Sequence, residues 1–133
     1  MEPQEHLKSG LFREDTFVVK EEHSAAHVGS GSLRVLATPW MVAYIENVAR
    51  VLMAEHLPDG YSSVGAHLNI RHLAPTPVGK RVRVRAEIVG VDGVKVSFTV
   101  QAWDDREQIG DGTHLRVIIE EGRFLRRVEK KLA

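Results

Sequence analysis

The spacing of hydrophobic positions along this chain changes once, near residue 60. From Pro39 to about His56 the apolar residues are spread around a helix rather than along one stripe. Such a helix must be buried on most of its circumference. Thr38 is a favoured N-cap residue, Pro39 suits the first helical position, and Pro58-Asp59-Gly60 forms a turn that ends the helix. The pattern therefore predicts a long helix at the centre of the fold.

After Tyr61 the apolar and polar residues alternate with a period of two, which is typical of strands buried on one face. We expect strands at residues 64–70, 82–88, 94–102 and 108–126, the last as one long strand or a broken pair. A short strand is expected at 16–21, and a small-residue loop at 23–32. Turns are predicted at 75–79, 92–93 and 104–105, and an irregularity that would form a bulge at 110–112.

One long helix followed by antiparallel strands predicts an α+β fold, in which a sheet of about five strands wraps around the helix. The 133 residues are expected to form a single domain, with residues 1–15 as a flexible or loosely packed N-terminus. A sheet of this size has edges. The arginine-rich segment 81–87 is a candidate edge strand, protected by its charges or joined to a partner subunit's sheet.

Composition removes several classes of function. Lys plus Arg and Asp plus Glu are both 18, so the formal net charge is 0 and no overall field favours nucleic-acid binding. With Cys at 0, disulfides and thiol catalysis are excluded. The polar start of the chain does not resemble a signal peptide, and no apolar run is long enough to span a bilayer. We therefore expect a cytoplasmic protein that does not act at a membrane.

Glu46 is the first candidate for chemistry, because it is a carboxylate within the apolar helix. It could be part of a solvated stripe, paired with Arg50 one turn later. His72 is the second candidate, since an imidazole at the end of a strand can act as an acid or a base near neutral pH. Thr38 is the third: it could be only an N-cap, but Met41 stands where a capping box would need Glu or Gln. Each residue alone also has an ordinary structural explanation.

Other patterns are less informative. His23 and His27 lack a third ligand at a defined spacing, so no metal site is expected. The glycines do not form a phosphate-binding loop. Arg81, Arg83, Arg85 and Arg116 recur with period two and are expected on one exposed sheet face, either as a solubilising surface or as a phosphate-binding patch for a nucleotide-tailed molecule such as coenzyme A.

Taken together, the segments ATPWMVAYIENVA, SSVGAHLNIRHLAPTPVGKRVRVRAEIVGVDG and IGDGTHLRVII resemble the hot-dog-fold thioesterases, most closely the fluoroacetyl-CoA thioesterase-like family. The resemblance covers roughly residues 17–128. Its specific part is the trio Thr38, Glu46 and His72, separated by eight and then twenty-six residues. The resemblance implies a long helix wrapped by a curved sheet, and a homodimer, possibly a tetramer, whose sheets join edge to edge around acyl-CoA pockets.

The resemblance also implies roles for residues. Glu46 would be the catalytic carboxylate, as a nucleophile on the thioester or as a base for water. His72 would polarise or relay protons, and Thr38 would orient Glu46 or the carbonyl. A directly attacking threonine is less attractive, because its hydroxyl needs a base in contact. Gly65 would offer its N–H to the thioester carbonyl, with Ala66 beside it in the substrate site, and Arg116 would position the substrate or lie at the interface. No metal or cofactor is implied, coenzyme A being part of the substrate.

The chain departs from the family between residues 23 and 35. The family's fluoroacetyl-specific members carry a longer, aromatic-rich lid there, whereas this chain has HSAAHVGSGSLRV without Phe, Tyr or Trp. We therefore expect a more open pocket and a different or broader acyl group. Two alternatives to a thioesterase remain at this stage: a non-catalytic module that binds or senses acyl-CoA, and a hydratase or dehydratase on the same fold.

Overall fold

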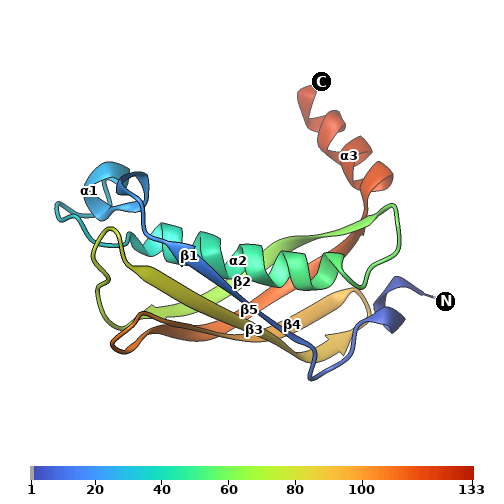
Figure 1. Ribbon diagram of the computed structural model, residues 1–133. Helices are drawn as coiled ribbons and strands as arrows, with labels where there is room; N and C mark the ends of the chain where they lie inside the picture. Colours follow the sequence, from blue (N-terminus) through green and yellow to red (C-terminus); the bar gives the residue numbers. More distant parts are fainter. Residues whose placement is uncertain (1) are drawn as a thin grey trace.

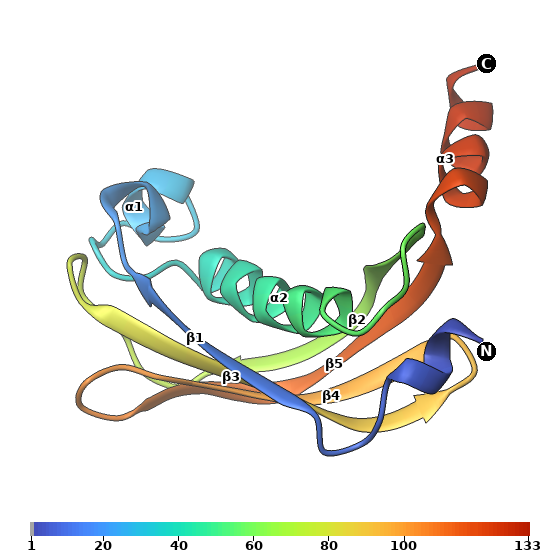
Figure 2. The same cartoon turned by 45° about the vertical axis from the view of Figure 1, so that its right-hand side comes forward.

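One long helix, α2, lies in the concave face of a curved antiparallel sheet (Figures 1 and 2). The computed structural model describes residues 2–133. In chain order its elements are η1 (Pro3–His6), β1 (Phe12–Val18), η2 (Glu21–His23), α1 (Ala25–Val28), α2 (Thr38–Ala54), β2 (Tyr61–His72), β3 (Arg81–Asp92), β4 (Lys95–Trp103), β5 (Gln108–Glu120), α3 (Glu121–Glu129) and η3 (Lys130–Leu132).

The five strands are ordered β1-β3-β4-β5-β2, and all neighbours are antiparallel. The predicted α+β fold, with a sheet of five strands wrapped around a long helix, is confirmed. The prediction that the arginine-rich strand could lie at an edge is wrong, because β3 lies between β1 and β4. Its charges instead face those of β1, where Glu14 lies opposite Arg85 in the register. The edges are β1 and β2.

The core lies between α2 and the inward face of the sheet. Because side chains alternate across a strand, every second residue of β3 and β4 points at the helix. The prediction that the helix is buried on most of its circumference is wrong, because its fully buried residues recur with helical spacing along one face while Asn47 and Arg50 are exposed. The buried side chains of α2, β3 and β4 include Met41, Ile45, Val48, Leu52, Met53, Val82, Val84, Ala86, Ile88, Val96, Phe98, Val100 and Ala102.

The N-terminal part of the chain is more ordered than its polarity suggested. The first strand spans Phe12–Val18 rather than residues 16–21, and it pairs with β3 along its whole length. Leu7 is buried in the core, so part of the segment expected to be loosely packed contributes to it. The short helix α1 lies within the predicted loop at 23–32, and the helical turn η2 ends at the first residue of that loop, His23. Neither turn is long enough to show helical periodicity in the sequence.

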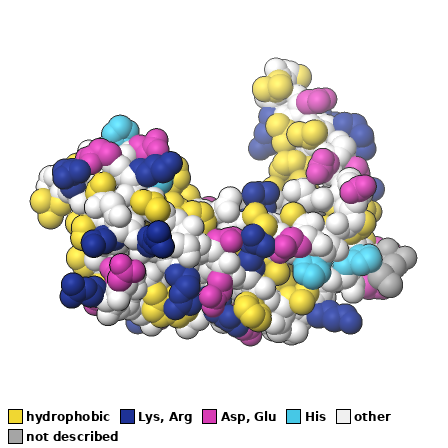
Figure 3. Space-filling model, viewed as in Figure 1, with side chains coloured by type: hydrophobic (Ala, Val, Ile, Leu, Met, Phe, Trp, Pro, Cys, Tyr) yellow, Lys and Arg dark blue, Asp and Glu magenta, His cyan; other side chains and the backbone are white. Residues whose placement is uncertain are grey.

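The hairpin at Asp92-Gly93 and the turn at 104–105 are confirmed. The last strand is shorter than expected, since β5 ends at Glu120 and residues 121–129 form α3. The Glu120 side chain accepts hydrogen bonds from the backbone N–H groups of Gly122 and Arg123, and so caps the helix. Figure 3 shows α3 as a column that stands apart from the body of the molecule.

Three irregularities interrupt the ladders. In β3 the register shifts between Ile88 and Gly90, so Val89 is the extra residue there. In β5 the register shifts between the partners of Ala102 and Trp103, so the extra residue is Ile109. It lies directly before the segment 110–112, where the bulge was predicted. In β2 the register shifts between Gly65 and His67, so Ala66 is the extra residue of a bulge that the sequence did not predict. Among residues 2–133, no helix is sufficiently long and apolar to cross a membrane.

Candidate active site

Thr38 and His72 are in contact. Thr38 is the first residue of α2, and Ala37 takes the N-cap position, so the prediction that Thr38 caps the helix is wrong. The Thr38 hydroxyl is instead free to meet His72, the last residue of β2, with 2.7 Å between Oγ1 and Nδ1. Burial lowers the pKa of His72, which favours the neutral imidazole. A neutral ring with an unprotonated Nδ1 accepts a hydrogen bond from the hydroxyl, so this threonine does have a base in contact.

The other nitrogen of the same ring is unusual. Within residues 2–133, Nε2 of His72 is buried without a hydrogen-bond partner. Buried polar atoms are normally paired, and an exception at a cleft is a feature of functional sites. A cavity of about 340 Å³ adjoins this pair. It is lined by Ala25, Ser30, Val35, Leu36, Thr38, His72, Leu73, Ala74 and Pro75.

Glu46 makes a different contact from the one its sequence neighbours suggest. The predicted pair with Arg50 is replaced by an ion pair with Arg116 of β5, with 3.6 Å between Oε2 and Nη1. The Glu46 side chain is 39% exposed, whereas that of Arg116 is only 5% exposed. The carboxylate is therefore held from the protein side and remains open on its other side.

Gly65 lies directly against this carboxylate. A Cβ atom at residue 65 would be 2.6 Å from Oε2 of Glu46, so a side chain here would have to displace the carboxylate. Gly65 pairs with Arg116 across the β2–β5 ladder and precedes the bulge residue Ala66. The structure thus brings Glu46, Gly65 and Arg116 together, with Ala66 next in the chain. That the Gly65 N–H binds a substrate carbonyl remains a prediction.

The predicted site residues form two groups rather than one. Thr38 and Glu46 are eight residues apart on one helix, which is about 12 Å along its axis. Gly65 and His72 are seven residues apart on β2, which is roughly 23 Å of strand. Within one chain, Thr38 meets His72 and Glu46 meets Gly65 and Arg116. The trio therefore does not converge on a single point in one subunit.

The expectation that Arg116 shares an exposed face with Arg81, Arg83 and Arg85 is wrong. The period of two holds on each strand, but Arg116 is on the face of β5 that points at α2, and it is buried. The odd-numbered arginines of β3 face outward. Arg83 stacks on Trp103 and Arg85 on Phe12, and both pair with Glu14. Because Arg85 also pairs with Glu87, two carboxylates offset the charges of these two arginines, which argues against a phosphate patch at them.

His114 is a buried residue of this region that the sequence analysis missed. It is 2% exposed, its Nδ1 lies 2.9 Å from the carbonyl oxygen of His67, and its Nε2 lies 3.2 Å from Nη1 of Arg116. Burial, together with the charge of Arg116, lowers its pKa. The sequence feature that could have identified His114 is its position two residues before Arg116, which puts both side chains on one face of β5.

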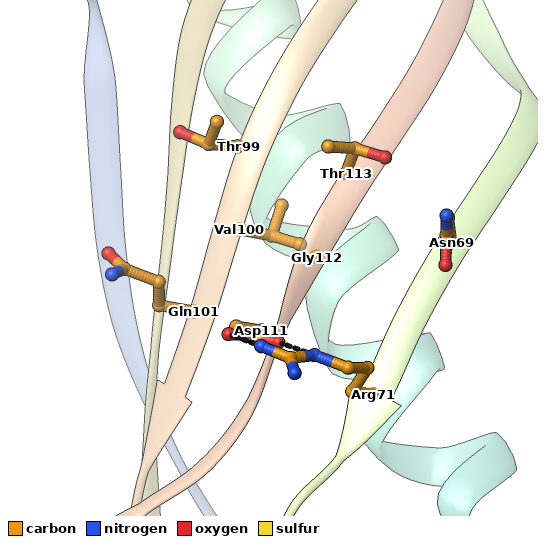
Figure 4. A pocket seen from close by; sticks show the side chains of 8 residues that line it. All are labelled: Asn69, Arg71, Thr99, Val100, Gln101, Asp111, Gly112 and Thr113. Carbon is orange, nitrogen blue, oxygen red and sulfur yellow. Dashed lines mark hydrogen bonds and ion pairs between the residues drawn. The ribbon is translucent and has the colours of Figure 1, made fainter.

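A larger cavity is lined by Arg71 and Thr113, the sequence neighbours of His72 and His114, and not by the predicted site residues themselves. It has a volume of about 530 Å³ and lies on the sheet face turned away from α2, where the Arg71–Asp111 ion pair spans part of it (Figure 4). Its polar lining includes Asn69, Thr99 and Gln101. Among residues 2–133, no group of three or more His, Asp or Glu side chains is arranged to hold a metal ion.

Comparison with known proteins gives a consistent result. Residues 19–122 match the model of a family described as FlK, fluoroacetyl-CoA-specific thioesterase. The chain is 38% identical over 97 residues to the fluoroacetyl-CoA thioesterase of Streptantibioticus cattleyicolor, covering 73% of this chain and 70% of that protein. A solved structure of the fluoroacetyl-CoA thioesterase FlK has a TM-score of 0.88 at 32% identity, covering 94% of this chain and 97% of that one. A hot-dog-like protein from Thermanaerovibrio acidaminovorans has a TM-score of 0.91 at 21% identity over 100% of this chain and 98% of that one, which shows the shared fold.

The two buried histidines predict how stability depends on pH. Because burial lowers the pKa of His72 and His114 below 6.5, the unfolded chain binds protons that the folded chain resists. The free energy of unfolding should therefore fall as the pH is lowered from 7.5 through 6.5 to 5.5. Chemical unfolding at these pH values should show that the free energy of unfolding falls less for His114→Gln than for the wild type. The surface variant His6→Leu is the control, and an unchanged pH dependence in His114→Gln would contradict the assignment.

Proposed function

The chain belongs to the fluoroacetyl-CoA-specific thioesterase family, and we propose that it hydrolyses acyl-CoA with Glu46, His72 and Thr38 as its catalytic side chains. The reaction converts a thioester and water to a carboxylic acid and free coenzyme A. One observation carries the assignment of the central residue: Glu46 is held from one side by Arg116 and Gly65 while its other side stays open. A carboxylate held in this way is positioned to act on a bound thioester.

Two routes are compatible with this arrangement. In the first, the Glu46 carboxylate attacks the thioester carbonyl, expels the coenzyme A thiolate and forms an anhydride that water then hydrolyses. In the second, Glu46 removes a proton from the water molecule that attacks the carbonyl. In both, the Gly65 N–H would stabilise the oxyanion, and His72 would relay to the departing thiolate a proton that the hydrolytic water gives up, so that the neutral imidazole is regenerated. All these roles belong to protein groups, so the proposed reaction requires no metal or cofactor.

The contact between Thr38 and His72 bears on a third route. A threonine nucleophile needs an adjacent base, and His72 lies 2.7 Å from the Thr38 hydroxyl. That contact equally suits a hydroxyl that orients the substrate carbonyl, held in place by the imidazole. We assign the orienting role, because Glu46 is already a stronger nucleophile or base at neutral pH than a neutral hydroxyl.

The separation of the two groups of residues supports a dimeric enzyme. The edge strand β1 is charged at Arg13, Glu14 and Asp15, whereas residues 65–69 of the other edge, β2, are exposed and carry no Asp, Glu, Lys or Arg. An uncharged edge is the one suited to pair with a second sheet. If β2 pairs antiparallel with its own copy about His67, then His72 of one subunit lies opposite residue 62 of the other. Each Thr38–His72 pair then approaches the partner's Glu46.

The activity itself is tested by thiol release from acyl-CoAs. Glu46→Gln keeps the shape of the side chain but removes its charge, and should lower kcat by about 10²- to 10⁴-fold. His72→Ala should cause a loss of the same order. Thr38→Val should be impaired, whereas Thr38→Ser, which keeps the hydroxyl, should retain more activity. If Glu46→Gln and His72→Ala both hydrolyse at the wild-type rate, the assignment is wrong; enoyl-CoA hydration without thiol release would indicate a hydratase.

The dimeric arrangement predicts complementation between two inactive variants. A heterodimer purified from subunits that carry Glu46→Gln and His72→Ala has one site with both substitutions and one site with neither. It should therefore regain roughly half of the wild-type activity per dimer, as expected for two equivalent sites at a two-fold interface. Each parental homodimer is the control. A heterodimer as inactive as its parents would show that Glu46 and His72 act within one subunit.

The cavity beside Thr38 and His72 suggests a class of acyl group. Apart from His72, its lining side chains are aliphatic or small, and its volume of about 340 Å³ is larger than a two-carbon acyl group requires. Nothing in it provides an aromatic lid, so we infer a preference for short aliphatic acyl chains over fluoroacetyl. Each additional buried CH₂ group contributes about 0.8 kcal/mol, which is roughly fourfold in affinity.

This preference predicts that kcat/KM rises from acetyl-CoA through propionyl-CoA to butyryl-CoA, with no advantage for fluoroacetyl-CoA. Val35→Phe would fill part of the cavity and should lower turnover of butyryl-CoA more than that of acetyl-CoA. Val28→Phe is the matched control, because Val28 lies in the same segment but is exposed and outside the cavity lining. Equal effects of Val35→Phe on both substrates would place the acyl group elsewhere.

A further inference from the structure

The guanidinium of Arg116 is held on three sides. Its Nε donates to the Ser63 hydroxyl at 2.9 Å and its Nη2 donates to the Ser63 carbonyl at 3.1 Å. The third nitrogen, Nη1, is 3.6 Å from Oε2 of Glu46 and 3.2 Å from Nε2 of His114. The nitrogen that faces the carboxylate is therefore the one that His114 also contacts.

The partners of His114 determine where its proton is. The His67 carbonyl can only accept a hydrogen bond, so Nδ1 must carry the hydrogen and donate it across 2.9 Å. An arginine nitrogen can only donate, so Nε2 must be unprotonated and accept from Nη1. Both contacts are satisfied only by the neutral ring with its hydrogen on Nδ1. A protonated ring would point a second N–H at a cationic guanidinium.

The contact with His67 ties the same ring to the bulge in β2. The extra residue of that bulge, Ala66, lies between Gly65 and His67. A Cβ atom at Gly65 would also be 3.4 Å from Cε1 of His114, so this ring packs directly beneath the glycine. The buried ring of Phe98 lies alongside, 5.9 Å from the imidazole between ring centres. One imidazole therefore contacts both structures that enclose the Glu46 carboxylate.

We propose that His114 is a positioning residue of the hydrolytic site: it holds Nη1 of Arg116 toward Glu46 and holds the β2 bulge that places Gly65 against the same carboxylate. The inference rests on the proposed catalytic role of Glu46. It does not require His114 to touch the substrate, from which it is separated by Arg116 and Gly65. Loss of the imidazole should slow the chemical step without weakening substrate binding, because the side chains that line the acyl cavity are unchanged.

Three substitutions separate the two contacts of His114. An asparagine amide can occupy the place of Nδ1 but falls short of Arg116, a glutamine can reach the place of Nε2, and leucine offers neither contact. In thiol-release assays, His114→Asn and His114→Leu should lose about 100-fold in kcat, the scale of a displacement of roughly 1 Å at a reacting group, with KM nearly unchanged. His114→Gln should recover kcat to within about tenfold of the wild type. His6→Leu is the control for loss of a surface histidine.

A double-mutant cycle with Arg116→Lys tests whether His114 acts through Arg116. Lysine keeps the charge but loses the fixed geometry of the guanidinium. If the inference holds, His114→Asn costs no more than about threefold in kcat when Arg116 is already lysine. If the kcat losses of the two single variants multiply in the double variant, His114 has only a structural role and the inference is overturned. Nitrogen chemical shifts of labelled wild-type protein should show His114 protonated at Nδ1, and the opposite tautomer would also overturn it.

The failures of this inference and of the proposed function can be told apart. If the wild type releases thiol and Glu46→Gln does not, but His114→Asn and His114→Leu keep kcat within about threefold, only the role of His114 is wrong. If His114→Gln has a kcat no higher than that of His114→Leu, the role of His114 is likewise wrong while that of Glu46 stands. If Glu46→Gln is as active as the wild type, the role of Glu46 is wrong and that of His114 falls with it.

Discussion

The site depends on one interaction, the pairing of the buried Arg116 guanidinium with the Glu46 carboxylate. A buried guanidinium is costly unless its donors are satisfied, and here Ser63, His114 and Glu46 share them. The pair also explains why a carboxylate can occur within a helix that is apolar nearly all round. Glu46 faces a specific cation, and Gly65 leaves the space that its Oε2 occupies. Removing the arginine would leave the carboxylate without its ion-pair partner.

The fold supports this interaction with rigid elements. Glu46 lies in the middle of a helix that packs one face in the core, and Arg116 and His114 lie on a strand paired on both sides. The bulge at Ala66 is the irregular feature at this point, and its neighbour His67 is bonded to His114. The exposed edge of β2 runs past the same point. The strand that carries Gly65 is therefore also the strand best suited to meet a second subunit, so the proposed site and the proposed dimer contact share β2.

Much of this could be predicted from the sequence, because it follows from local patterns. The long helix, the alternating strands and the hairpin at Asp92-Gly93 all come from periodicity and turn chemistry. The resemblance to the hot-dog thioesterases predicted Thr38, Glu46, His72, Gly65 and Arg116 as site residues, and the structure places Glu46, Gly65 and Arg116 together. It also led to the family that the comparisons support.

What the sequence could not provide depends on contacts between distant segments. Glu46 was expected to pair with Arg50, which is near in sequence, and instead pairs with a residue seventy positions away. Arg116 was grouped with the β3 arginines although alternation along one strand does not show which face the residues of another strand occupy. β2 lies at an edge of the sheet and β3 does not, because β1 pairs with β3. The helix α3 was not predicted, because its residues were interpreted as the end of the last alternating strand. Apart from its spacing from Arg116, no feature of the sequence indicates that His114 belongs to the site.

The most direct test of the central claim is a crystal structure of Glu46→Gln with an unhydrolysed short-chain acyl-CoA. The account predicts that the thioester carbon lies within about 3.5 Å of the residue 46 side chain, the distance of a near-attack geometry. Its oxygen should face the Gly65 N–H, and the acyl chain should extend into the cavity beside Thr38 and His72 of the second subunit. A thioester bound away from residue 46, for example in the polar cavity on the outer sheet face shown in Figure 4, would contradict the account.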